Sequence, residues 1–416
     1  MFERDKWQEI LQALKENKLR TFLTAFGIFW GMFMLMVMLG AGTGLQNGAF
    51  RDLGDFAINS CFVWTQPTTM PYKGFKKGRN YNFELKDMEM LRNRIPGIGF
   101  LSPRYHRGTT SVSRNNKTEG FNVIGDFPDY NNIDPLNIKS GRYLNSIDIE
   151  NQRKVIVIGE RVKEVLFPNG EDPLGQYLKI NGIYFQVVGI FSSKHTGGWG
   201  RFQNQAIEMP LTTMQKSYNL GNIVGYFALT AKPGVSAKSI EEKAIGILKA
   251  AHYVHPDDQM AVGHQNVEEQ FKQFTGLFSG IQLLIWIVGL GTLFAGVVGV
   301  SNIMLVVVRE RTQEFGIQRA IGATPWNIIS QLLLESVFLT TLAGYIGLFI
   351  GIALVQLCNV VLSTMDIESF YNPQINLKVA TTALIILIFS GILAGIIPAR
   401  KAVSMKPIDA IRSEYK

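Results

Sequence analysis

The chain has 416 residues, of which 47% are hydrophobic and 18% charged, and its formal net charge is +8. The basic residues are mixed with acidic ones and form no run interleaved with aromatic side chains, so the charge does not indicate nucleic-acid binding. Two cysteines, Cys61 and Cys358, are too few for a disulfide framework. The apolar residues gather in four long runs, which predict a membrane module joined to soluble parts.

The first of these runs follows a short polar segment. Residues 1–20 predict an amphipathic helix on the inner membrane surface, because their apolar side chains recur at helical spacing. The run Phe22–Leu45 is too long for the core of a cleavable signal peptide, and further apolar runs follow it. We therefore expect a first transmembrane helix over residues 21–45.

Three more spans are predicted in the second half of the chain. The runs Leu277–Val308, Ser336–Leu362 and Val379–Ile397 approach or exceed the roughly 20 residues that cross a bilayer. A continuous helix from Asn266 is expected to enter the first of them and project beyond the membrane as a stalk. The predicted order is a second transmembrane and stalk helix at 277–308, a cytoplasmic coupling helix and turn at 309–335, a third transmembrane helix at 336–362, a short outer loop at 363–378, a fourth transmembrane helix at 379–398 and a cytoplasmic tail at 399–416.

Lysine and arginine predict the orientation of these helices. Basic residues precede the first span, recur between residues 309 and 319, and follow the last span at Arg400 and Lys401. Because basic loops stay on the cytoplasmic side, we expect both termini inside the cell and residues 46–276 outside it. No charged residue lies in the heart of a span, Glu335 being the nearest, and this favours an external energy source over ion-driven transport.

Residues 46–276 predict an extracytoplasmic domain of mixed α/β type. Short β-rich stretches indicate strands, and Asn181-Gly182 indicates a hairpin turn between two of them. Helices are expected from Asn82 and over Ser236–Ala251. The expected strands are Phe56–Thr65, Val155–Gly159, Tyr177–Ile180 and Tyr184–Phe191.

A charged segment between the second and third spans has the pattern of a helix, a turn and a second helix. Its first part, residues 309–320, carries five charges together with an apolar strip at helical spacing. Gly322 is placed to end that helix, because glycine adopts the left-handed conformation without a Cβ clash. Thr324 and Pro325 are placed to cap and open the next helix. The apolar strip comprises Phe315, Ile317, Ala320 and Ile321.

Four stretches of sequence carry a resemblance to a known family. In chain order they are KENKLRTFLTAFGIFWG, GRYLNSIDIENQRKVIVIGERVKEVLFPNGEDPLGQYLKINGIYFQVVGIF, RERTQEFGIQRAIGATPWNI and PARKAVSMKPIDAIRSE. Their order and spacing resemble those of FtsX/MacB-type ABC transporter permeases over nearly the whole chain. The resemblance implies an α-helical membrane protein with four transmembrane helices and a large extracytoplasmic mixed α/β domain. That domain would have two subdomains, a compact β-rich insert at about residues 141–211 and an α/β platform built from the flanking pieces.

The resemblance also implies a site. In this family the segment between the second and third membrane helices docks on the ATPase subunit. Gln318 stands where the family often has a basic residue, so the charge pattern departs from the family there. The positions that the resemblance assigns to the ATPase contact are Arg309, Glu310, Arg311, Glu314, Gly316, Arg319, Gly322 and Ala323.

The function implied is that of a permease subunit in the inner membrane of a bacterium. A homodimer of such subunits would convert ATP hydrolysis by a separate ATPase subunit into movement of the extracytoplasmic domain (mechanotransmission). The implied cargo is drugs, peptides or toxins, passed to a periplasmic adaptor protein and an outer-membrane channel. The sequence starts at the amphipathic helix and contains no P-loop, since the glycine-rich stretch at 40–44 lacks the lysine. We therefore expect no cofactor in this chain, with ATP bound by the partner, and no enzyme site.

Other functions stay open at this point. The same scaffold serves lipoprotein release and the control of cell-wall hydrolases, although the large outer region favours efflux over the cell-division type. A membrane-anchored binding or scaffold protein without energy coupling would explain the anchors and the domain, but not the structured inner segment. His252 and His255, followed by Asp257 and Asp258, indicate either a metal site or a solvated loop. Glycines four residues apart in the spans suit close helix packing, in a dimer seam or elsewhere.

Overall fold

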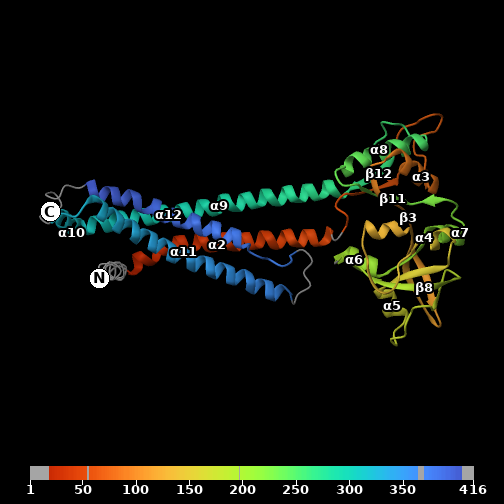
Figure 1. Cartoon of the computed structure of the whole chain (residues 1–416), viewed down its shortest axis with the longest axis horizontal. Helices are drawn as coiled ribbons and strands as arrows, with labels where there is room; N and C mark the ends of the chain where they lie inside the picture. The colour runs from red at the N-terminus through yellow and green to blue at the C-terminus, as the bar shows by residue number, and fades with distance from the viewer. Residues whose placement is uncertain (1–17, 54–55, 196, 364–369, 405–416) are drawn as a thin grey trace. The chain divides into compact units, whose positions relative to one another are not determined.

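The computed structural model describes residues 18–53, 56–195, 197–363 and 370–404 (Figure 1). Its internal contacts divide the chain into two units, one formed by Met1–Ala49 with Leu277–Lys416 and the other by Phe50–Gly276. We name the first the membrane unit and the second the large domain. Most of the predicted amphipathic helix and of the predicted tail lies outside the described residues.

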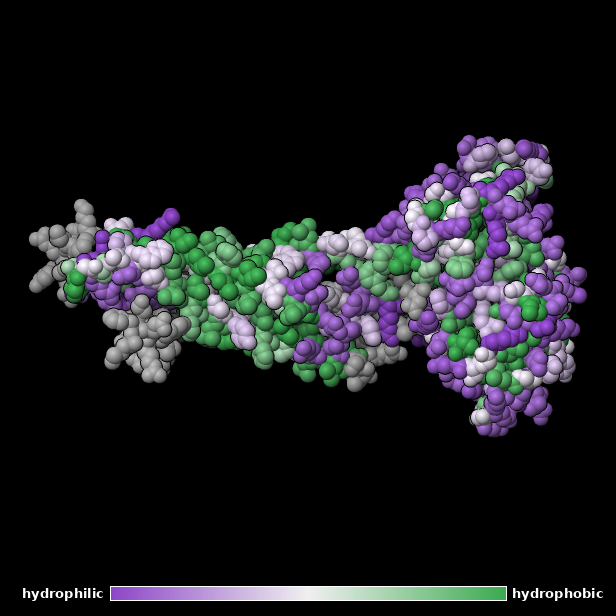
Figure 2. Space-filling model, viewed as in Figure 1, coloured by the Kyte–Doolittle hydropathy of each residue, from purple (hydrophilic) through white to green (hydrophobic). Residues whose placement is uncertain are grey.

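In the described part of the membrane unit there are four long helices, and each is long and apolar enough to cross a membrane. In Figure 2, hydrophobic side chains cover these helices and hydrophilic ones cover most of the large domain. The helix expected from Asn266 is confirmed, and the Asn266 side chain caps it by accepting the N–H of Glu269 at 3.0 Å. The helices are α2 Lys18–Leu53, α9 Val267–Glu310, α11 Pro325–Ser363 and α12 Leu377–Ser404, and the short helix α10 Thr312–Ala320 joins α9 to α11.

Small residues let these helices approach one another closely within one chain. A Cβ added at Gly347 would lie 2.5 Å from the carbonyl oxygen of Phe29, and one added at Gly391 would lie 2.2 Å from Thr340 Oγ1. Both distances are far below van der Waals contact, so α11 packs against α2 and α12 only because glycine stands at these positions. The predicted close packing therefore occurs inside the membrane unit.

The large domain is built on a mixed β-sheet. Its strands are β1 Ser60–Thr65, β2 Phe83–Glu84, β3 Ile98–Arg114, β4 Lys117–Asp126, β5 Asn137–Gly141, β6 Val155–Gly159, β7 Tyr177–Ile180, β8 Ile183–Ser192, β9 Ala206–Pro210, β10 Ile223–Val224, β11 Tyr226–Ala231 and β12 Val262–Asn266. Ten of them form one sheet in the order β12–β1–β11–β3–β4–β9–β6–β8–β5, with β7 paired to β3 and β8. The strands β2 and β10 form a separate antiparallel pair.

Short helices pack on this sheet and divide the interior into two main cores. The first core includes Leu91, Phe227 and Leu248 and lies under α3 and α8. The second includes Val112, Phe121 and Ile158 and lies under α5 and α7. Because Val112 and Phe121 come from β3 and β4, the second core reaches further back along the chain than the insert expected at 141–211. The helices are α3 Leu85–Arg94, η1 Pro128–Asn132, α4 Ser146–Glu150, α5 Glu160–Leu166, α6 Gly197–Asn204, α7 Leu211–Ser217 and α8 Ala237–Ala251.

The predicted local signals in the domain are confirmed with two corrections. Asn181 and Gly182 have φ values of 45° and 92° and turn the chain between β7 and β8, as their hairpin signal predicts. The helix expected from Asn82 begins at Leu85, because the preceding two residues pair with β10 as strand β2. The strand expected from Phe56 begins at Ser60, whose N–H closes a turn on the carbonyl of Ala57.

Candidate coupling segment and candidate binding pocket

The segment that joins α9 to α11 has two sharp breaks. At the first, Arg311 leaves the helical conformation (φ −96°, ψ 14°) between the end of α9 and the start of α10. At the second, the N–H groups of Gly322 and Ala323 donate to the carbonyls of Arg319 and Gln318 at 3.1 and 2.9 Å. This pair of bonds is a Schellman motif, and Gly322 has the positive φ (105°) that the motif requires. The predicted glycine stop and the predicted helix start at Pro325 are both confirmed.

Arg311 holds the first break in place. Its guanidinium donates two hydrogen bonds of 2.8 Å to the carboxylate of Glu314, and it lies 3.7 Å from Oε2 of Glu335 on α11. It also lies over the ring of Phe315, at 5.4 Å from the centroid. Glu335 is only 4% exposed, so Arg311 supplies the counter-charge of a buried carboxylate.

Further contacts fix α10 to the membrane unit. Phe315 is buried in the hydrophobic core that also contains Val308 of α9 and Ile328 of α11. The Arg319 guanidinium donates a 2.8 Å hydrogen bond to the carbonyl of Val403, in the last turn of α12. The short helix is therefore attached to three of the four long helices, and a displacement of α10 has to move them as well.

All eight predicted ATPase-contacting residues lie on this segment, at the end of α9, on α10 and in the turn after it. Gly316 is buried, and Arg311, Arg319 and Ala323 are half-buried. The exposed members of the set are Arg309, Glu310, Glu314 and Gly322. Their contact with an ATPase stays a prediction.

The apolar strip of this segment is not a single buried face. Phe315 is buried, but Ile317 and Ile321 are 44% and 83% exposed, and Trp326 at the start of α11 is 69% exposed. Trp326 is not among the predicted contact residues, although a tryptophan beside a helix start in a charged loop is a sequence signal for an exposed contact. These exposed side chains are available to a partner protein.

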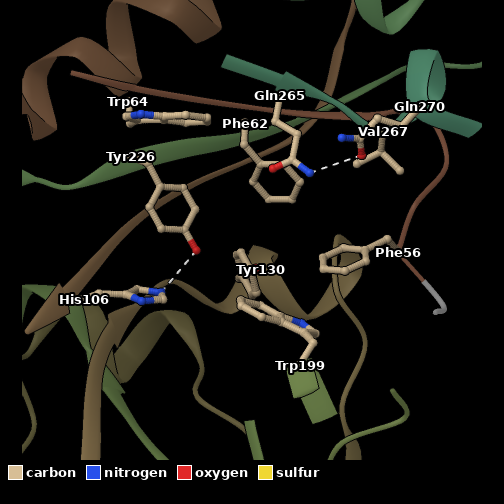
Figure 3. Close-up of a pocket in the computed structure, with 10 residues that line it drawn as sticks. All are labelled: Phe56, Phe62, Trp64, His106, Tyr130, Trp199, Tyr226, Gln265, Val267 and Gln270. Atoms are coloured by element: carbon tan, nitrogen blue, oxygen red, sulfur yellow. Dashed lines mark hydrogen bonds between the residues drawn. The ribbon is translucent and has the colours of Figure 1, made fainter. Parts of the chain in front are cut away.

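A second candidate site is a pocket of about 390 Å³ in the large domain (Figure 3). Its walls come from the start of the domain, from β1, β3, β11 and β12, from η1 and α6, and from the first turn of α9. Aromatic side chains dominate its lining: Phe56, Phe62, Trp64, Tyr130, Trp199 and Tyr226. No local pattern predicts this pocket, because the lining residues are brought together only by the folded sheet.

Charged groups are buried next to the pocket. Arg104 is 1% exposed, lies 3.7 Å from the centroid of the Tyr130 ring, and is bound by Asp126 at 2.8 Å and by Glu208 at 2.6 Å. Burial raises the pKa of both carboxyl groups, and the Arg104 charge opposes that rise. Tyr143 donates a further hydrogen bond of 2.7 Å to Glu208. The network joins β3, β4 and β9 and supports the pocket from behind.

His252 and Asp258, two of the four residues considered as a metal site, bind different partners. His252 Nε2 lies 2.7 Å from the Asp87 carboxylate, whereas Asp258 accepts hydrogen bonds from Thr69 and from the Met70 N–H. Within the described ranges, no group of three histidine, cysteine, aspartate or glutamate side chains is placed to hold a metal ion. These contacts fasten the loop after α8 to its neighbours.

Comparisons with known proteins agree with this architecture. A family model for a MacB-like periplasmic core domain matches residues 21–247, and one for an FtsX-like permease C-terminal region matches residues 286–407. The macrolide export ATP-binding/permease protein MacB of Bdellovibrio bacteriovorus is 28% identical over 406 residues, covering 97% of this chain and 61% of that protein. The pyoverdine export ATP-binding/permease protein PvdT of Pseudomonas putida is 26% identical over 416 residues, covering 98% and 60%. The chain thus spans about three fifths of the length of these relatives.

Two solved structures resemble parts of the chain. The periplasmic region of MacB from Actinobacillus actinomycetemcomitans aligns with a TM-score of 0.43 and 20% identity, covering 53% of this chain and 94% of that one. The extracellular domain of the ABC-type transporter YknZ from Gram-positive bacteria aligns with a TM-score of 0.42 and 16% identity, covering 50% and 100%. The match to the periplasmic core model alone covers more than half of the sequence. The chain therefore belongs to the FtsX/MacB-type ABC transporter permeases, with a MacB-like periplasmic core domain and an FtsX-like permease region.

Proposed function

We propose that this chain is the permease subunit of an exporter and that a separate ATPase subunit docks on the segment from Arg309 to Ala323. ATP binding and hydrolysis in that subunit would displace the segment. The observation that carries the proposal is the construction of α10, which is fixed to α9, α11 and α12 while Ile321 and Trp326 beside it stay exposed. A partner protein can bind the exposed apolar side chains, and because α10 is attached to three long helices, a push on α10 would be passed on to them.

Helix α9 is the proposed carrier of the movement. It runs without interruption through 44 residues from Val267 to Glu310, about 66 Å at 1.5 Å per residue. One end leads into α10, and the other follows strand β12 of the large domain directly. A continuous helix transmits displacement along its axis, so the large domain would move when α10 is pushed.

We further infer that α10 and both termini face the cytoplasm and that the large domain lies outside the inner membrane. The cluster of basic residues around α10 and the match to a periplasmic core domain support this orientation. The proposed assembly is a homodimer that works with a periplasmic adaptor and an outer-membrane channel. Relatives named for the export of macrolides and of pyoverdine support drugs, peptides or toxins as the class of cargo.

Isolation of the complex tests the proposed partner. The chain, purified in mild detergent from its native membranes, is expected to bring down an ABC-class ATPase that hydrolyses MgATP. A variant with both Ile321→Asp and Trp326→Asp should bind the ATPase at least about tenfold more weakly than the wild type. This corresponds to a loss of about 1.4 kcal/mol or more in binding free energy. Met260→Asp is the matched control, because Met260 is 62% exposed on the large domain. An ATPase that is missing from the wild-type preparation, or fully retained by the double variant, would contradict the proposal.

A further inference from the structure

The pocket of the large domain has the size and surface of a small-ligand site. Its volume of about 390 Å³ falls within the range of roughly 300–1,000 Å³ that small-molecule sites occupy. Rings from five different elements face it, and in Figure 3 Trp64, Tyr226 and Trp199 surround the space on three sides. Aromatic walls of this kind bury a flat ring system by stacking and edge contacts.

The lining carries no formal charge. None of the ten lining residues is lysine, arginine, aspartate or glutamate. The one imidazole in the lining, His106, stacks on Phe202. Loss of hydration and the nearby Arg104 charge both lower the pKa of His106, so its imidazole is neutral at physiological pH. A charged ligand would lose its hydration here without gaining a counter-ion. The Arg104 guanidinium lies against one face of the Tyr130 ring, so that face is not available to the cation of a ligand.

Polar groups at the pocket complement an amide. Gln265 Nε2 donates to Gln270 Oε1 at 3.1 Å, a bond drawn in Figure 3. Within the described part of the chain, this leaves Gln265 Oε1 as a free acceptor and Gln270 Nε2 as a free donor. The buried indole N–H of Trp199 also has no acceptor among the described residues. An amide group on a ligand offers the matching N–H and carbonyl.

We propose that this pocket binds an uncharged aromatic compound that carries an amide group, with its ring among the aromatic walls and its amide at Gln265 and Gln270. Binding in this pocket does not depend on the coupling proposed above, because the experiments below measure equilibrium binding alone. Val267 and Gln270 belong to the first turn of α9, so a bound ligand touches the helix that continues to α10. The same chemistry is available in a free solute and in an aromatic residue of a partner polypeptide.

A set of three tryptophan derivatives tests the charge selectivity. N-acetyltryptophanamide is neutral, N-acetyltryptophan is an anion, and tryptophanamide is a cation at about pH 6, below the pKa of an α-amine. Binding to the full chain in detergent is measured by saturation-transfer NMR, with empty micelles as the blank. The neutral compound is expected to bind at least about tenfold more tightly than either charged one, a difference of 1.4 kcal/mol. Equal or tighter binding of a charged form, or no binding of the neutral one, would overturn the proposal.

Two variants locate the binding and one serves as the control. Trp199→Ala is expected to weaken binding of the neutral compound by about fivefold to tenfold, since it removes one aromatic wall. Gln270→Ala, on the surface of a helix that should still fold, is expected to weaken N-acetyltryptophanamide but not 3-methylindole, which has no amide. Tyr184→Ala removes an aromatic side chain that is 59% exposed and does not line the pocket, and it should leave affinity unchanged. Unaltered affinity in both pocket variants would place the binding elsewhere and refute the assignment.

A capped peptide with one central tryptophan distinguishes the two sources of ligand. If the peptide binds more tightly than N-acetyltryptophanamide, the pocket takes a residue of a polypeptide. If it binds equally or more weakly, the pocket takes a free solute. Either result supports the proposed chemistry, whereas loss of charge selectivity among the three tryptophan derivatives would count against it.

Discussion

Arg311→Ala is expected to lower the free energy of unfolding of the chain by about 3 kcal/mol. The substitution leaves the carboxylate of Glu335, which is almost fully buried, without its nearby positive charge. It also removes both hydrogen bonds to Glu314 that hold the break between α9 and α10. The measurement is the midpoint of thermal unfolding in detergent, followed by size-exclusion chromatography after heating.

A double-mutant cycle separates the buried charge from other effects of losing Arg311. Arg311→Ala combined with Glu335→Gln should recover most of the lost stability, because the uncompensated charge is gone. Glu314→Gln is the matched control: its side chain is exposed, the contact between Arg311 and Glu335 remains, and we expect a loss below about 1 kcal/mol. A double variant as unstable as Arg311→Ala alone would show that Glu335 is not the cause.

Gly322→Ala is expected to uncouple the proposed ATPase from export while the protein still inserts into the membrane. The φ of 105° at this position costs a residue with a Cβ about 1–3 kcal/mol, although nothing lies within 4 Å of the added atom. The strain can be relieved only by opening the Schellman turn, which would change the angle between α10 and α11. The measurement compares ATP hydrolysis with transport in reconstituted vesicles.

Gly299→Ala is the matched control for this substitution. Gly299 lies inside α9 with helical backbone, and a Cβ added there would meet nothing within 4 Å among the described residues, so alanine should be tolerated or slightly stabilising. We expect the Gly299 variant to export at the wild-type rate per ATP. Coupled export by the Gly322 variant at that same rate would mean that the turn geometry does not matter.

The membrane helices and the turn at Gly322 were predictable because local rules determine them. Long apolar runs select membrane helices by composition alone, and glycine followed by threonine and proline sets a helix stop and a helix start. The end of α2 was not predictable in the same way. Leu53 lies in a polar stretch, where the apolar run has ended but the helix continues.

Strand β3 and the pocket show where sequence reasoning fails. Pro103 and Gly108 interrupt the sequence of β3, and its first half is a strand because β11 pairs with it from more than 100 residues away. The pocket depends on that pairing, since it places His106 beside Tyr226. Neither residue has a neighbour in sequence that reveals the site. The pairing register of strands that are far apart in the sequence therefore determines the pocket, for which no local sequence signal exists.

Labelling of single cysteines in intact cells is the most direct test of the account, because force can pass across the membrane only if α10 and the large domain lie on opposite sides. Cys358→Ser removes the exposed native thiol, and Cys61 is only 1% exposed. Into this background, Tyr184→Cys places a thiol on the large domain and Ile321→Cys places one beside α10. A membrane-impermeant maleimide is predicted to label position 184 in intact cells and position 321 only after the membrane is permeabilised. Labelling of both positions, or of neither, in intact cells would contradict the account.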